Sequence, residues 1–210
     1  MTAQFPTLDA LTDEIREMGT HSAEYWDKQV HRVPTSQVVD RLAYLTKHAT
    51  GKTVLHVGCT GVLDQALCKV ATRCYGIDSQ PLTREHFEMV DLDRVATTGL
   101  PIFEGVDLIV CGEVLEHLSN PGYFLESLRR SYPTVPVVLT VPNAFSEAGQ
   151  SWLLNRGREN VHREHVCYYS YTTLATLLAR TGYTSVRHFW YGGKPYISEG
   201  LIMVAEPQKD

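Results

Sequence analysis

The chain of 210 residues lacks both a basic charge excess and a long apolar run. Its 19 Lys and Arg against 24 Asp and Glu give a formal charge of -5, so no broad basic field exists to attract a nucleic-acid backbone. No run approaches membrane-spanning length, and the N-terminus is not a basic start followed by an apolar block. We therefore expect a cytoplasmic protein without membrane insertion, whose partner is a small molecule or glycan and not a nucleic acid.

Cysteine is also scarce, and the spacing of the cysteines does not indicate a disulfide framework. The five cysteines are an odd number, and several lie inside apolar runs where they behave as small buried side chains. Their spacing matches no zinc motif. The sequence also has no repeat, linker or low-complexity tract. We expect one globular domain overall, in which residues 1–50 form an N-terminal helical cap segment and residues 51–210 the main domain.

Strand-like and helix-like patterns alternate along the chain. Apolar, β-branched runs predict strands and apolar spacing of three to four predicts helices. The expected strands are 53–57, 73–77, 87–90, 106–111, 135–141, 185–191 and 201–205, and the expected helices are 36–47, 62–72, 81–86, 121–130 and 172–181. Residues 142–164 read as a polar segment. This alternation predicts an α/β protein with a mostly parallel, doubly wound sheet, whose ligand binds beyond the carboxyl ends of the strands.

Two glycines and one acid indicate a cofactor. Gly58 and Gly61 follow the first strand, and Asp78 ends the second strand about twenty residues later, where an acid can accept both hydroxyls of a ribose. The glycines alone are a weak signal, because a plain tight turn between strand and helix also explains them. A complete G-x-G-x-x-G turn is absent, and Asp64 is a poor neighbour for a phosphate. A nucleoside-containing cofactor other than a dinucleotide is the better interpretation.

Four segments resemble one enzyme family. They are VLHVGCTG at 54–61, GID at 76–78, VDLIVCGEVLEHL at 106–118 and TVPNAFS at 140–146, followed by HREHVCYYSYTTLATLLARTGY at 162–183. Over most of residues 50–206 the chain resembles class I S-adenosylmethionine-dependent methyltransferases, especially ubiquinone-biosynthesis and glycan O-methyltransferases. The resemblance implies a Rossmann-like fold with a seven-stranded sheet, helices on both faces and an antiparallel C-terminal strand. It also implies that S-adenosylhomocysteine is the product.

The resemblance implies cofactor-binding roles for particular residues of this chain. The turn from Gly58 to Gly61 would pass beside the methionine portion, and Asp78 would bind the ribose. The adenine edge would lie against Asp91 and Leu92, and the methionine and sulfonium end against Cys111, Gly112 and Glu113. The family usually has an acid where His56 stands and a turn one glycine longer. His56 would orient the cofactor's ammonium group only through a neutral ring nitrogen or a water.

Methyl transfer to a hydroxyl needs a group that removes its proton. His165 is our first candidate for this base, in a polar loop expected at the mouth of the pocket, and His162 is a candidate for acceptor binding. His117 lies four residues after Glu113, on the same side of a helical turn, and is either a second catalytic candidate or a residue that only orients its turn. The alternatives for the His-x-x-His pair are metal ligands or plain surface-loop residues. No further ligand pattern accompanies the pair, so we expect no metal.

The N-terminal segment supplies further candidates. Tyr25 and Trp26 would either cover the bound acceptor or cofactor or only pin a helix to the core. Arg32 would pair with the cofactor carboxylate.

The sequence predicts an S-adenosylmethionine-dependent methyltransferase, which O-methylates a small hydroxylated metabolite or a sugar of a glycan or natural product. The alternative is a non-catalytic Rossmann-like cofactor-binding or regulatory protein, in which His56 and the short turn do not support catalysis. A nicotinamide-dependent oxidoreductase is disfavoured because no Tyr-x-x-x-Lys pair is recognisable.

Overall fold

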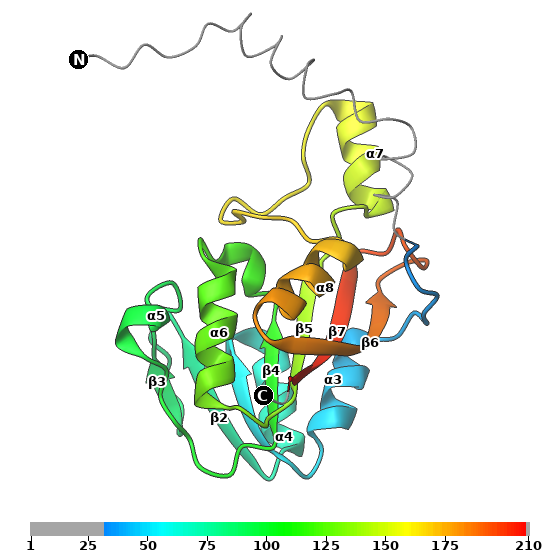
Figure 1. The fold of residues 1–210 in the computed structure, drawn as a ribbon. Helices are drawn as coiled ribbons and strands as arrows, with labels where there is room; N and C mark the ends of the chain where they lie inside the picture. Colours follow the sequence, from blue (N-terminus) through cyan, green and yellow to red (C-terminus); the bar gives the residue numbers. More distant parts are fainter. Residues whose placement is uncertain (1–31, 209–210) are drawn as a thin grey trace, which may run out of the picture. The chain divides into compact units, whose positions relative to one another are not determined.

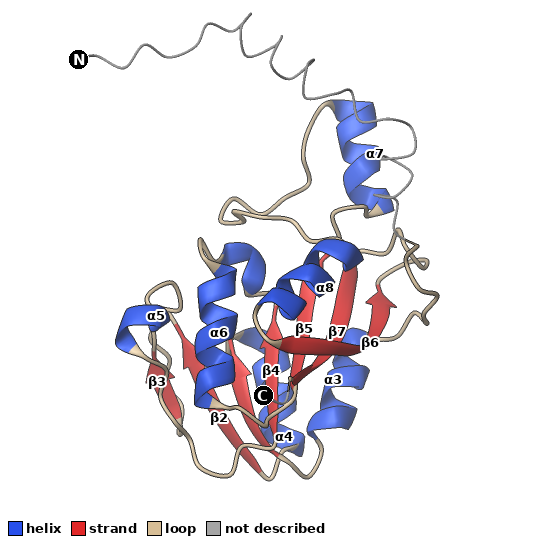
Figure 2. Cartoon of the chain, in the orientation of Figure 1, coloured by secondary structure: helices blue, strands red, loops and turns tan. Residues whose placement is uncertain are grey.

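The computed structural model describes residues 32–208, and the unit from Thr35 onward carries a single seven-stranded sheet with the order β3-β2-β1-β4-β5-β7-β6. Five strands are parallel, and β7 runs antiparallel to both of its neighbours. Figure 1 shows the chain order of these elements, and Figure 2 separates the strands from the helices that flank them. The strands are β1 Thr53–Val57, β2 Arg73–Asp78, β3 Phe87–Met89, β4 Leu108–Gly112, β5 Val137–Pro142, β6 Tyr183–Tyr191 and β7 Gly200–Pro207.

Helices cover both faces of the sheet. They are α3 Arg41–Ala49, α4 Gly61–Val70, α5 Val95–Thr98, α6 Pro121–Ser131, α7 Glu147–Arg156 and α8 Tyr171–Arg180, with a 3₁₀ turn, η1, at Leu115–His117. In Figure 1, α6 and α8 lie in front of the sheet and α3 and α4 behind it. The fold predicted from the sequence is therefore confirmed, down to the antiparallel last strand.

The core forms where apolar strand residues meet the inner faces of the helices. Leu45 of α3 and Leu67 of α4 are fully buried against Val54, Val110 and Ile202 of three different strands. Burying a leucine side chain contributes about 1.5–3 kcal/mol, so these contacts hold α3 and α4 onto the sheet. Within the described residues, no helix is long and apolar enough to cross a membrane.

The register of the central strands aligns their carboxyl ends. Val57 of β1 pairs with Ile77 of β2 on one side and with Cys111 of β4 on the other. The residues that come next, Gly58, Asp78 and Gly112, therefore lie side by side at one edge of the sheet. This edge is where the sequence predicted the ligand.

Two predicted helices differ in the structure. The helix expected over 36–47 begins only at Arg41, because the preceding residues pair with β6: Trp190 donates to the carbonyl of Gln37, and the Val39 amide donates to Trp190. Residues 81–86 form no helix. There the Arg84 guanidinium reaches back to the carbonyl of Cys74, so a tertiary contact holds the segment.

The segment 142–164, expected to be polar and irregular, contains α7. Ser146 caps this helix by accepting a hydrogen bond from the Gly149 amide at 3.1 Å. Within the described residues, α7 buries none of its side chains, and Figure 1 shows it standing off from the sheet. An apolar stripe is the usual sign of a helix. A helix that buries no face leaves no such pattern.

Candidate active site

A cavity of about 520 Å³ opens at the carboxyl edge of the sheet. This volume is within the usual range of small-molecule and cofactor sites. Seven predicted site residues line it, namely Gly58, Asp78, Asp91, Leu92, Gly112, Glu113 and His117. The sequence did not single out several other lining residues, including Arg41, Thr60, Ser79, Gln80 and Glu164.

The turn after β1 contains two glycines whose conformation lets another group approach the backbone closely. Gly58 has φ of 73° and Gly61 has φ of 68°, a left-handed region that side chains with a Cβ rarely adopt. A Cβ on Gly58 would lie 2.3 Å from a methyl carbon of Val114, whereas one on Gly61 would meet nothing within 4 Å. Gly58 is therefore required by both conformation and space, and Gly61 by conformation alone.

Asp78 is the last residue of β2, Asp91 lies two residues after the end of β3, and both line this cavity. Asp78 is 7% exposed, and one carboxylate oxygen accepts a hydrogen bond from the Gln80 amide at 2.8 Å. Asp91 accepts from the Asp93 amide and pairs with Arg94 on the surface. These local bonds orient the two carboxylates without closing the cavity between them.

Glu113 is held in an unusual conformation by three partners. Its φ of 57° lies in the left-handed region, which is uncommon for a non-glycine residue and marks functional sites more often than others. Its carboxylate accepts from the Thr140 hydroxyl at 2.8 Å and the Tyr191 hydroxyl at 2.7 Å, and pairs with Arg41 at 3.2 Å. Burial, and then the charge of Glu113, raise the pKa of Tyr191. Tyr191 therefore stays a donor to Glu113.

Arg41 is a positively charged residue of this cavity that the sequence did not indicate. The Asp40 carboxylate accepts from the Ala43 amide at 2.7 Å and so begins α3 at Arg41. The guanidinium lies 5.1 Å from the centre of the Tyr191 ring. Arg32, the arginine proposed from sequence, belongs to the separate unit of residues 1–34. Tyr25 and Trp26 lie outside the described residues.

His56 lies beneath the cavity and does not line it. Its side chain is fully buried in β1, and its Nδ1 lies 2.9 Å from an Asp64 carboxylate oxygen of α4. Arg84 pairs with the same carboxylate oxygen. The buried position alone would raise the pKa of Asp64, but the hydrogen bond from His56 and the charges of His56 and Arg84 outweigh it and hold this pKa below its ordinary value.

Two other predicted cofactor residues also fall outside the cavity lining. Cys111 is fully buried in β4, and Gly61 begins α4 behind the turn. Both adjoin lining residues in the chain, since Gly112 follows Cys111 and Thr60 precedes Gly61. Their backbones shape the edge of the sheet, while their neighbours face the cavity.

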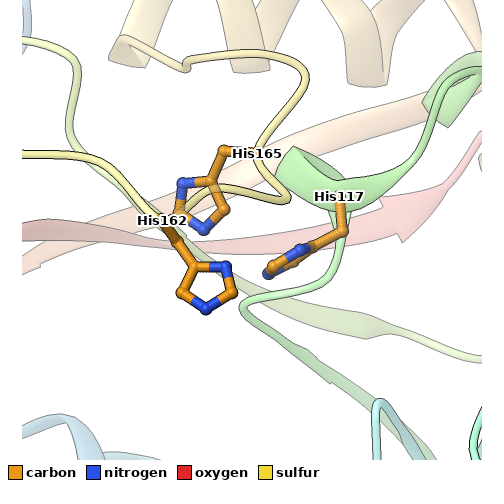
Figure 3. Close-up of side chains that lie close together, drawn as sticks. All are labelled: His117, His162 and His165. Atoms are coloured by element: carbon orange, nitrogen blue, oxygen red, sulfur yellow. The ribbon is translucent and has the colours of Figure 1, made fainter.

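The histidines predicted to serve the acceptor gather in one cluster, which we call the histidine cluster: His117, His162 and His165. His117 comes from η1, the other two from the loop before α8, and Figure 3 shows the three rings around one small space. His117 lines the first cavity, whereas His162 and His165 line a second cavity of about 630 Å³ under α7. The cluster therefore lies at the junction of the two cavities.

Backbone hydrogen bonds attach the histidine loop to η1. The amides of Val166 and Cys167 both donate to the carbonyl of Glu116, at 2.8 Å and 3.3 Å. The hydroxyl of Tyr169 donates to the carbonyl of Leu115. These bonds fix the place of His165 opposite His117 although the two residues are far apart in the sequence.

The surroundings favour an uncharged His165 and an uncharged Glu116. Partial burial, and then the charges of His117 and His162, lower the pKa of His165. Burial, and then the charge of Glu113, raise the pKa of Glu116 to about 8. Among the described residues, neither carboxylate oxygen of Glu116 has a hydrogen-bond partner. At neutral pH the imidazole of His165 is thus free to accept a proton.

Residues 26–188 match the model of a family described as "methyltransferase domain". The chain belongs to this family. The match spans the glycine turn, the strand-end acids, η1 and the histidine loop. The family predicted from the sequence, that of the S-adenosylmethionine-dependent methyltransferases, is confirmed by this match.

Known proteins that resemble this methyltransferase agree with the family. A ubiquinone biosynthesis O-methyltransferase of Paraburkholderia xenovorans (strain LB400) is 29% identical over 130 residues, covering 55% of this chain and 56% of the relative. The chain therefore spans about half the length of the curated relatives it matches.

Solved structures confirm the fold. Magnesium protoporphyrin IX methyltransferase of Synechocystis PCC 6803, with bound S-adenosylhomocysteine, has a TM-score of 0.56 at 15% identity and covers 94% of this chain and 100% of its own. The 1,6-didemethyltoxoflavin-N1-methyltransferase of Burkholderia thailandensis, also with S-adenosylhomocysteine, has a TM-score of 0.57 at 15% identity and covers 100% of this chain and 94% of its own.

Proposed function

We propose that this chain transfers a methyl group from S-adenosylmethionine to a hydroxyl of a small acceptor. The cofactor binds in the first cavity. The observation that carries this assignment is the alignment of the Gly58 turn, Asp78 and Glu113 around one cavity at the carboxyl ends of β1, β2 and β4. Binding beyond the carboxyl ends of parallel strands is the general rule for such sheets.

Charge and shape support one orientation of the cofactor. Asp78, on β2, accepts hydrogen bonds from the ribose hydroxyls, and Asp91 and Leu92 contact the adenine. Glu113 lies across the cavity with Arg41, so an ammonium and a carboxylate group of one amino acid find opposite charges there. The buried His56 acts from below through Asp64 and not on the ammonium group directly.

The acceptor enters the second cavity, which adjoins the first at the histidine cluster. Its wall combines apolar groups of Leu153, Val161 and Tyr168 with carboxylates of Glu159 and Glu199. This lining suits a compact acceptor with an apolar body and hydroxyl groups. The relatives named as O-methyltransferases support oxygen as the methylated atom. A charged polymer is less suited, in keeping with the net charge of -5.

The transfer itself is an in-line displacement at the methyl carbon. The hydroxyl oxygen forms the new bond to the methyl carbon as the bond from that carbon to sulfur breaks, and S-adenosylhomocysteine leaves. The acceptor's proton passes to the histidine cluster, where His165 is the first candidate and His117 the second. General-base assistance of this kind contributes typically 10²–10⁴-fold to the rate.

Calorimetric titration with S-adenosylmethionine, S-adenosylhomocysteine and NADH tests the cofactor without knowledge of the acceptor. We expect the two adenosyl ligands to bind and NADH not to bind. An absence of adenosyl binding would overturn the proposal and favour the non-catalytic alternative, in which His56 and the short turn no longer support the cofactor. Acceptor screening with hydroxylated compounds follows only after the first result.

A further inference from the structure

The histidine cluster has the arrangement of a metal-ligand set. The ligand nitrogens of His117, His162 and His165 all lie within 4.8 Å of one another. Their ring centres are 4.6, 5.5 and 5.7 Å apart. Three imidazoles bound to one tetrahedral zinc ion, with Zn–N bonds of about 2.0–2.1 Å, place their ring centres about 5 Å apart. We propose that the histidine cluster binds a divalent transition-metal ion of the zinc type.

The chemistry of the donors selects the class of ion. Three neutral imidazole nitrogens suit zinc and its transition-metal neighbours, whereas magnesium and calcium prefer sets of oxygen ligands. Three protein ligands also leave a fourth coordination position open, as in catalytic zinc sites. His162 is exposed and the other two histidines are partly exposed, so their side chains have room to rotate toward a shared ion.

The backbone prepares this arrangement before any ion binds. The His165 amide donates to the carbonyl of His162 at 3.1 Å, and this turn brings the two rings to one side of the loop. The Val166 amide then anchors the turn to Glu116, next to His117. Preorganised ligands lose little freedom on binding, which favours affinity.

The position of the site gives the ion a role in the proposed function, on which this step rests. The cluster lies between the two cavities, so an acceptor hydroxyl in the second cavity can occupy the open coordination position. Coordination lowers the pKa of a bound hydroxyl as it does that of bound water. The proton then leaves to solvent, and the oxygen takes the methyl group while S-adenosylhomocysteine departs. In this form of the mechanism the histidines are ligands, and none of them alone is the base.

Zinc titration of tag-free, metal-depleted protein tests the site directly. We expect one zinc ion per chain, and at least about 10-fold weaker binding for His162→Ala and for His165→Ala, because each removes one of three ligands. Cobalt added instead should give the strong visible absorption of a low-coordinate Co²⁺ ion. His86→Asn is the matched control, since His86 is exposed, lies outside the cluster and has a left-handed φ of 56° that asparagine tolerates.

A second group of potential ligands needs its own control. Asp64, Cys68 and Cys74 also lie within 4.8 Å of one another. We expect Cys68→Ser to leave the zinc affinity unchanged. Equal zinc affinity in wild type and both histidine variants, or a loss in Cys68→Ser alone, would overturn the proposed site.

Titration of the same proteins with S-adenosylhomocysteine separates the two proposals. Normal binding of that ligand by every variant shows that each is folded. If it binds while zinc does not, the metal site is wrong and the proposed function stands. If zinc binds at the histidines while S-adenosylhomocysteine does not, the metal site stands and the methyltransferase assignment of the first cavity fails.

Discussion

The two cavities are built in different ways. The first is lined by residues at strand ends, whose positions follow from the register of β1, β2 and β4. The second is lined mainly by the segment after β5, by α7 and by the histidine loop, which lie outside the sheet, with Pro142 at the end of β5 as the contribution of a strand. Strand pairing fixes the geometry of a sheet edge, whereas a surface segment outside the sheet can change without disturbing the core. We infer that the sheet edge handles the cofactor and that the segment after β5 selects the acceptor.

Removing an imidazole at the junction should affect catalysis and spare the first cavity. His165→Ala should lower turnover about 100-fold or more, because the hydroxyl loses the group that assists departure of its proton. The affinity for S-adenosylhomocysteine should stay within about twofold, since His165 does not line the first cavity. Steady-state kinetics on an identified acceptor, combined with calorimetry, measures both quantities. Full turnover would transfer the role to His117 or to solvent.

Removing a strand-end carboxylate should instead impair ligand binding in the first cavity. Asp78→Ala should weaken S-adenosylhomocysteine binding by about 1–3 kcal/mol, because buried ribose hydroxyls lose their acceptor. Asp107→Ala is the matched control: Asp107 also bonds a backbone amide, that of Thr53, but at the start of β4, on the opposite edge. Unchanged affinity in the Asp78 variant would remove that residue from the cofactor site.

The two glycines of the turn allow a finer test of the first cavity. Gly58→Ala should lower the free energy of unfolding by about 1–3 kcal/mol through its left-handed φ, with a further cost from the contact with Val114. Gly61→Ala has the same backbone penalty without the contact, and so should be the milder variant. Urea unfolding of both proteins measures the difference. Equal losses would show that crowding by Val114 does not matter.

Six of the residues that the sequence singled out for the cofactor line the first cavity, because their positions depend on local patterns. The strand, the glycine turn at Gly58 and the strand-end acid Asp78 are each recognisable from a short local pattern, although Gly58 and Asp78 lie about twenty residues apart. Arg41 was missed because its role depends on where Asp40 ends the extended segment and begins α3. His56 was placed correctly in its strand, yet its partner Asp64 could be assigned only once α4 was packed over β1.

The second cavity was predicted poorly for a physical reason. The helix α7 buries none of its side chains within the described residues, so its sequence carries no apolar stripe. The convergence of His117 with the 162–165 loop depends on long-range backbone bonds to Glu116, which no local spacing reveals. The sequence singled out His117, His162 and His165 as candidates, but it did not show that the three rings meet in one cluster.

The buried His56–Asp64–Arg84 contact beneath the first cavity should depend on pH. Asp64→Asn should lower the free energy of unfolding by about 1–2 kcal/mol at pH 7, because Arg84 loses its charged partner. Because the folded-state pKa of Asp64 is below its unfolded value of about 3.9, the stabilisation is present above that value. It is lost as the pH falls through the lower, folded pKa. Urea titrations from pH 7 to pH 2 should therefore show the two proteins converging at the acid end, and a constant difference would contradict the charge-based account.

The smallest effect on stability is expected for an exposed side chain of α7, the helix over the second cavity. Leu154 of α7 is 82% exposed, so Leu154→Ser should change the free energy of unfolding by less than about 0.5 kcal/mol. Leu67 of α4 is fully buried, so Leu67→Ala is the matched comparison and should cost about 2–5 kcal/mol. Chemical denaturation of both variants compares the two regions on one scale. A large loss for Leu154→Ser would show that α7 packs against the body of the protein in solution, and the separation of a fixed cofactor region from an adaptable acceptor region would then fail.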